Sequence, residues 1–169
     1  MKGLLALKTS KGQAVIIDFA IAFLLFALAW AFITVEFEEK YAERIDADSL
    51  KLMKLKAETT IDFLVKSKGS PENWEELTIN DLNSVGLAET DRALSESKLS
   101  AFQNFSSSYD TLRATMGLEQ YDFYFQFTGV DDANAGLVPG SNANQIIVQR
   151  IVEYKGEVGV AELNVYKLD

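Results

Sequence analysis

An uninterrupted apolar run near the amino terminus constrains this chain more than any other feature. Residues 14–35 carry one charged side chain, Asp18, and residues 19–35 carry none. A helix over this run would be about 33 Å long at about 1.5 Å per residue, which matches the roughly 30 Å hydrocarbon core of a bilayer. Large apolar residues fall on every face of that helix, unlike the one-sided pattern of a helix packed on a globular core. The run therefore predicts a membrane-spanning helix.

The charges that flank the run predict its orientation. Lys2, Lys8 and Lys11 precede it, whereas the residues directly after Val35 are mostly acidic. Since the formal net charge is −9 and residues 1–35 contribute +2, residues 36–169 carry −11. Lysines are retained on the cytoplasmic side of a membrane, so we expect a single-pass protein with a cytoplasmic N-terminus and an extracytoplasmic C-terminal part. The acidic surplus repels phosphate groups, so nucleic acid is not an expected partner.

The composition narrows the chemistry that this chain can perform. The 169 residues allow one domain of ordinary size and one membrane segment. Cysteine and histidine are both absent, which excludes disulfides, thiolate metal sites and the commonest general base. We therefore expect no enzyme and no cofactor.

A secretory signal peptide would also begin with lysines and an apolar run. Its apolar core is usually shorter, and a small-residue cleavage site follows it. Here the run is longer, and it leads into Glu36-Phe37-Glu38-Glu39 without such a site. We therefore expect the apolar helix to remain on the mature protein.

Lys11-Gly12-Gln13 directly precedes the apolar run, and this arrangement resembles the class III signal peptides of archaeal type IV pilin-like proteins. The resemblance implies that a prepilin peptidase-like enzyme cuts after Gly12 at the cytoplasmic face. Residues 1–12 would then be a cleaved leader, and residues 13–35 a transmembrane or filament-core helix. Other pilin-like subunits would be possible partners.

Asp18 departs by one position from the same family pattern. The family usually carries an acidic residue at the fifth mature position, whereas Asp18 would be the sixth after cleavage before Gln13. The resemblance implies an assembly role, in which Asp18 pairs with the N-terminal amine of a neighbouring subunit. The alternative is that its carboxylate reaches the headgroups or favours the positive end of the helix.

Residues 36–169 are expected to form an extracytoplasmic α+β head. Apolar residues recur at helical spacing after Val35, and no Gly or Pro interrupts residues 13–68, so the long helix should become amphipathic and end near Gly69 and Pro71. Short extended pieces are expected near residues 77–79 and 85–87, with Trp74 holding this loop on the core. Two short helices should follow over residues 96–105 and 108–116, the first capped by Ser95 and the second ended by Gly117.

The last third of the sequence changes to an alternating pattern. Residues 121–128, 145–154 and 157–166 are rich in β-branched and aromatic side chains, which predicts an antiparallel meander packed on the amphipathic half of the long helix. Four segments resemble those of archaeal pilin-like proteins: Ser70-Pro71-Glu72-Asn73-Trp74, Val85-Gly86-Leu87-Ala88, Lys98-Leu99 and Tyr121-Asp122-Phe123-Tyr124. The resemblance implies a type IV pilin-like fold.

Two further patterns in the head could carry a site. Asn104-Phe105-Ser106 is an N-glycosylation sequon. Asp131, Asp132 and Asn134, followed by Gly136, place oxygen ligands on a loop as calcium requires, but without the spacing of an EF-hand, and a solvated turn is the alternative.

Two functions are consistent with the sequence. The first is a membrane-anchored, type IV pilin-like surface subunit with a structural role in assembly, for which a surface filament is one possible location. The alternative is an uncleaved, single-pass ectodomain that binds a partner or ligand at the cell surface.

Overall fold

The computed structural model describes residues 6–141 and 143–167, and for residues 6–15 and 38–46 it describes the backbone alone. The chain forms two compact units, Met1–Asp48 and Ser49–Asp169. Helix α1 (Ala6–Lys66) supplies the described residues of the first unit and the first element of the second. The prediction of one long helix without an interruption is confirmed.

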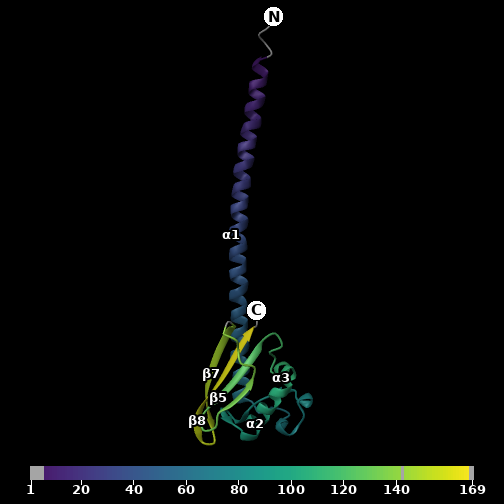
Figure 1. The fold of residues 1–169 in the computed structure, drawn as a ribbon, viewed down its shortest axis with the longest axis vertical. Helices are drawn as coiled ribbons and strands as arrows, with labels where there is room; N and C mark the ends of the chain where they lie inside the picture. Colours follow the sequence, from purple (N-terminus) through teal and green to yellow (C-terminus); the bar gives the residue numbers. More distant parts are fainter. Residues whose placement is uncertain (1–5, 142, 168–169) are drawn as a thin grey trace. The chain divides into compact units, whose positions relative to one another are not determined.

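The second unit, called the head below, is an α+β domain. Its elements after α1 are β1 (Gly69–Ser70), η1 (Trp74–Glu76), η2 (Ile79–Asp81), β2 (Ser84–Val85), β3 (Ala88–Thr90), β4 (Ala93–Leu94), α2 (Glu96–Asn104), η3 (Phe105–Ser108), α3 (Tyr109–Thr115), β5 (Asp122–Thr128), β6 (Ala133–Gly136), β7 (Asn144–Tyr154) and β8 (Glu157–Lys167). Six strands form one curled sheet in the order β3-β4-β7-β8-β5-β6, and β1 pairs with β2 in a small separate sheet (Figure 1). The α+β class is therefore confirmed.

The sheet differs from the predicted antiparallel meander in two ways. It is mixed, because β4 runs parallel to β7, with Ala93 opposite Glu153. Its strand order is also not sequential, since β8 lies between β7 and β5. In this central position the inner side chains of β8 are covered on both sides by neighbouring strands, and Ala161, Leu163 and Val165 are completely buried.

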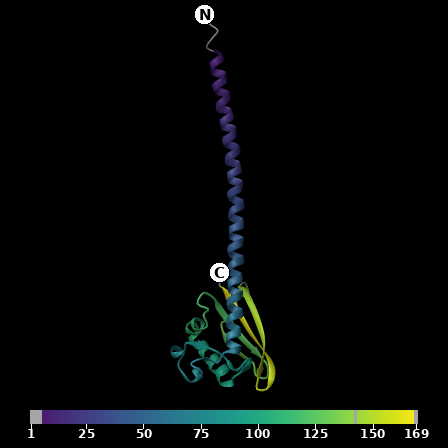
Figure 2. The ribbon, with the colours of Figure 1, turned by 180° about the vertical axis from the view of Figure 1, so that it is seen from behind.

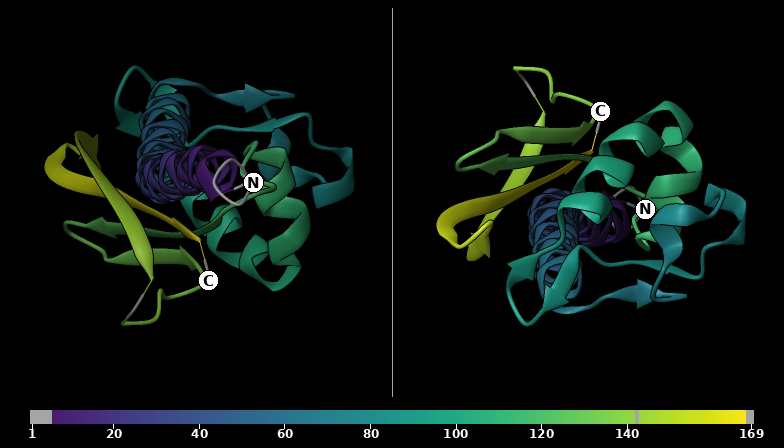
Figure 3. Two further views of the ribbon diagram at one scale, coloured as in Figure 1. Left: turned by 90° about the horizontal axis from the view of Figure 1, so that it is seen from above. Right: turned by 90° about the horizontal axis from the view of Figure 1, so that it is seen from below.

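One face of the sheet is covered by helices. Residues 49–66 of α1 lie alongside the sheet, as the view from behind shows (Figure 2). In the end-on views, α2 and α3 lie beside them on the concave side of the sheet (Figure 3). From α1, Ala57, Ile61 and Val65 are fully buried in the core. From α2, the Phe102 ring meets the Phe125 ring edge-on at 5.4 Å between centroids.

The loop after α1 is held in place by Trp74. Its indole is completely buried, and Nε1 donates hydrogen bonds to the carbonyl oxygens of Lys68 at 3.1 Å and Gly86 at 2.9 Å. The prediction that Trp74 fixes this loop on the core is confirmed. A Cβ atom at Gly86 would collide with the backbone of Ser67, so glycine is required for this close approach.

The predicted loop and helices are correct in part. The helix ends at Lys66, and Gly69 follows with φ of +83°, as a stop signal requires. The extended piece predicted near residues 77–79 is correct for Leu77 and Thr78, whose backbone is extended, but it forms no strand, and the chain turns into η2 at Ile79, where Thr78 Oγ1 donates to Asp81 Oδ2 at 2.7 Å. Ser95 occupies the N-cap position of α2, but its side chain makes no capping hydrogen bond.

Candidate anchor and interaction surfaces

The apolar segment of α1 is the most distinctive surface of the first unit. Ile16–Phe37 is long and apolar enough to cross a membrane, with a mean hydropathy of 2.5 and no part of it buried, although a signal sequence near the N-terminus has the same properties. Rings four residues apart stack along the helix, Phe19 on Phe23 and Phe26 on Trp30. A helix that exposes apolar side chains all round is stable only in lipid or against other apolar surfaces.

Asp18 lies within this apolar segment. Its side chain is exposed, and it makes no hydrogen bond or ion pair with any part of the chain that the structure describes. A carboxylate placed so in a membrane segment is costly and is usually paired or functional. The geometry therefore leaves Asp18 free to meet a group from outside the described residues.

The predicted processing site lies where the structure describes only the backbone. Lys11, Gly12 and Gln13 belong to α1, and their side chains lie outside the described residues. The cleavage site after Gly12 therefore stays a prediction from the sequence.

The predicted glycosylation sequon lies where α2 ends. Asn104 is exposed and is the last residue of the helix. The hydroxyl of Ser106 accepts a hydrogen bond from the backbone N–H of Gly136 at 3.2 Å. The amide side chain is therefore accessible, while the sequon's serine helps to fix β6.

The three candidate calcium ligands have separate surroundings. Asp131 Oδ2 accepts a hydrogen bond from Lys155 Nζ at 2.9 Å, and the same ammonium group contacts Glu96 at 2.8 Å. Asp132 accepts a bond from the N–H of Gly129, and Asn134 lies in β6. Among the described residues, no three acidic side chains come together as metal ligands would.

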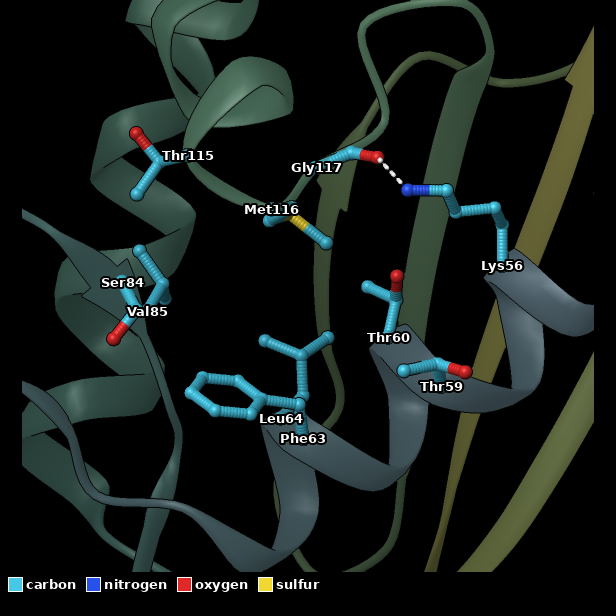
Figure 4. A pocket seen from close by; sticks show the side chains of 10 residues that line it. All are labelled: Lys56, Thr59, Thr60, Phe63, Leu64, Ser84, Val85, Thr115, Met116 and Gly117. Carbon is cyan, nitrogen blue, oxygen red and sulfur yellow. Dashed lines mark hydrogen bonds between the residues drawn. The ribbon is translucent and has the colours of Figure 1, made fainter.

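A shallow groove runs along α1 in the head, and the sequence did not indicate it. It has a volume of about 280 Å³. In the close-up, Phe63 and Met116 face it from opposite sides, and Lys56 Nζ donates to Gly117 O at 3.3 Å near its rim (Figure 4). The lining comes from three segments: residues 56–64 of α1, residues 84–85 of β2, and residues 115–117 at the end of α3.

The chemistry of this groove is mainly apolar. Leu64 and Val85 are buried in its floor, and Phe63 remains 44% exposed. A second hollow of about 390 Å³ continues along α1 and shares Lys56 and Gly117 with the first. With a single ammonium group and several hydroxyls, such a surface suits an apolar segment with polar ends rather than a charged small molecule.

A half-buried polar cluster joins α3 to β5. Tyr109 Oη donates to Asp122 Oδ1 at 2.9 Å, and Arg113 Nη1 contacts the same oxygen at 2.9 Å. The backbone N–H of Phe123 donates to Tyr109 Oη. Burial, and then the hydrogen bond to Asp122, raises the pKa of Tyr109 above its usual value, so the phenol keeps its proton. The cluster is closed to solvent on most sides and holds the fold together.

Comparison with known proteins leaves this chain without a match: no protein-family model, no curated protein and no solved structure is detectably similar to it.

Proposed function

We propose that this protein is a membrane-anchored surface subunit of the type IV pilin-like kind, with a structural role in assembly. The observation that carries the proposal is the combination of Ile16–Phe37, apolar and exposed on every side, with a separately folded α+β head. A helix of this kind can exchange lipid for neighbouring apolar helices at little hydrophobic cost, so storage in the membrane and packing in a filament core are both open to it.

Three features of the sequence support the same function. The lysines before the helix favour a head outside the cell. Lys11-Gly12-Gln13 lies where a prepilin peptidase-like enzyme would cut, at the cytoplasmic edge of the apolar segment. Asp18 is the charged group within the segment that is available to pair with the new N-terminal amine of a neighbouring subunit.

Mass spectrometry of the mature N-terminus tests this function directly. We expect the chain isolated from its native membrane to begin at Gln13 with the apolar helix retained. Gly12→Val should block cleavage, because the peptidase no longer meets a glycine at the junction. Gly3→Val is the matched control, since it changes the leader to the same extent without touching the junction. A mature chain that begins at Met1, or beyond Val35, would refute the pilin-like function.

A second candidate function is favoured by the groove along α1. A single-pass ectodomain that keeps its leader could bind the apolar segment of a surface partner there, next to Phe63 and Met116. The same mass measurement separates the two functions, because this candidate requires an uncleaved N-terminus.

A further inference from the structure

Strand β7 has one side that no neighbouring strand occupies. Along its full length, from Asn144 to Tyr154, it pairs with β8 without a bulge. On the other side, β4 pairs only with Glu153 and Tyr154. Among the described strands, none covers residues 144–152 on that side, so they form an open edge of the sheet (Figure 1).

The backbone groups that face this edge can be identified. Glu153 N donates to Arg92 O at 2.8 Å, so the backbone groups of Glu153 point away from β8. Because groups alternate along a regular strand, those of Gln145, Ile147, Gln149 and Ile151 point the same way. One of them already has a donor within the chain, since Arg150 Nη1 contacts Gln149 O at 2.9 Å.

This edge has few of the features that usually protect one, apart from the Arg150 guanidinium group on the carbonyl oxygen of Gln149. Natural edges are blunted by charged side chains, prolines, bulges or short strands. Here the residues whose backbone groups face the edge are exposed, Ile147 and Ile151 to 50% and 69%. No proline interrupts residues 144–152. The charged side chain nearest the centre, Arg150, is turned toward α1, where Nε donates to Asp62 Oδ1 at 2.6 Å.

We propose that β7 pairs edge to edge with β7 of a second copy of this chain, joining two heads through one continuous sheet. The pattern of the strand favours a second copy as the partner because it is symmetric about Gln149. In an antiparallel two-fold pairing, Gln149 lies opposite itself, and Ile147 lies opposite Ile151 of the other copy. Each isoleucine then gains an apolar cross-strand neighbour on the outer face of the sheet.

The neighbouring strands fix the extent of this pairing. Residues 147–151 of each copy can pair: Ile147 and Ile151 would form about four interchain backbone hydrogen bonds, and the two Gln149 residues can add two more through carbonyl oxygens that each also accept from Arg150. Beyond them the partner strand must turn away, since the edge at Glu153 is already taken by β4. Val160 of β8 lies opposite Ile151 of β7 and is exposed, so it extends the apolar surface that the two copies would share. The proposal does not depend on cleavage of the leader or on filament assembly.

The absence of cysteine allows a specific test with the full-length chain in detergent. With Gln149→Cys, mild oxidation should yield a covalent dimer, because the two sulfur atoms would lie across the two-fold axis within disulfide reach. Adding Ile147→Pro should reduce the dimer at least about tenfold. Proline there removes an N–H that faces the open edge and leaves the bonds to β8 intact.

Two controls keep the test specific. Ile151→Lys in the Gln149→Cys chain should also suppress the dimer, whereas Val158→Lys should not, although Val158 is an equally apolar and 77% exposed residue of the adjacent strand. Circular dichroism checks that each variant keeps its fold. Absence of the dimer from Gln149→Cys, or a dimer that persists undiminished with Ile147→Pro and Ile151→Lys, would overturn the proposal. Neither outcome bears on where the N-terminus is cut.

Discussion

Arg150 on β7 and Asp62 on α1 form an ion pair with 2.6 Å between Nε and Oδ1. Asp62 also accepts a hydrogen bond from Lys66 Nζ at 3.0 Å, one turn further along the helix. Through these contacts the carboxylate joins the last turns of α1 to the sheet. Partial burial raises the pKa of Asp62, but the bonds from Arg150 and Lys66 outweigh it, so the pKa lies below its usual value.

Asp62→Asn should therefore destabilise the head at neutral pH. Because the two side chains of the pair are 38% and 29% exposed, solvent screening limits the loss to about 1 kcal/mol. The folded-state pKa is lowered, so the contribution is present above the unfolded pKa of about 3.9 and disappears as the pH falls through the folded value. The difference between wild type and variant should thus shrink below about pH 4.

Urea unfolding at several pH values measures this difference. Fluorescence of Trp74 reports on the head when Trp30→Phe removes the other of the two tryptophans. Glu58→Gln is the matched control, since Glu58 lies 3.9 Å from Lys54 in an exposed pair of the same helix. Equal losses for Asp62→Asn and Glu58→Gln would contradict the special role of Asp62.

Gly86→Ala should destabilise the head by about 3 kcal/mol or more, because a methyl group there meets backbone atoms of Ser67 and Gly69 that cannot move aside cheaply. Gly140→Ala is the control, since nothing lies within 4 Å of a Cβ atom at Gly140. The same urea titration compares the two. If both variants unfold at the wild-type midpoint, Gly86 does not approach Ser67 and Gly69 as closely as the structure shows.

The proposed orientation of the anchor predicts that the head is accessible from outside the cell. Because Lys2, Lys8 and Lys11 precede the apolar helix, protease added to intact cells should digest the head once any surface layer is stripped. Replacing the three lysines by glutamine should lower the digested fraction. A head that is cut only after lysis would show the reverse topology.

Asp18→Ala should affect assembly and leave the head as stable as before. Removing a carboxylate from an apolar helix saves about 1–3 kcal/mol of insertion cost, so insertion should be unchanged or better. If subunits assemble as proposed, what is lost is the partner for a neighbouring N-terminal amine, which would remain unpaired in an apolar bundle. The measurements are membrane insertion, thermal unfolding of the head and the amount of high-molecular-weight surface material.

Asp18→Glu is the control for charge, because it keeps a carboxylate on the same turn of the helix. Surface assemblies that are equally abundant in Asp18→Ala and wild type would remove Asp18 from the mechanism. A wild-type chain that forms no assemblies would favour the monomeric ectodomain.

Much of the fold could be predicted from local sequence patterns. The long helix, its end before Gly69, the buried Trp74 and the residues of β5, β7 and β8 all follow from periodicity and stop signals. The parallel pairing of β4 could not be predicted, because Ala93 and Leu94 pair not only with the nearby β3 but also with Glu153 and Tyr154, some 60 residues later. Strand order is likewise set by packing between distant segments.

The candidate surfaces likewise separate into those that a linear sequence pattern predicts and those that only distant segments form together. Asp18 and the processing motif are linear patterns, whereas the groove brings Phe63 together with Val85 and Met116, which share no sequence signal. The alternation of β7 predicted a strand, but only the shortness of β4 shows that most of its edge is open. Surfaces made by several segments therefore had to be found in the structure.

The position of β8 has a consequence for how the head is made. β8 follows every other strand of the sheet in the chain, yet it is the strand that connects β7 to β5 and, through β5, to β6. Until the ribosome has added residues 157–167, the two halves of the sheet have no strand between them, and their apolar faces cannot be buried together. Folding of this head is therefore a late event that follows synthesis of its last strand.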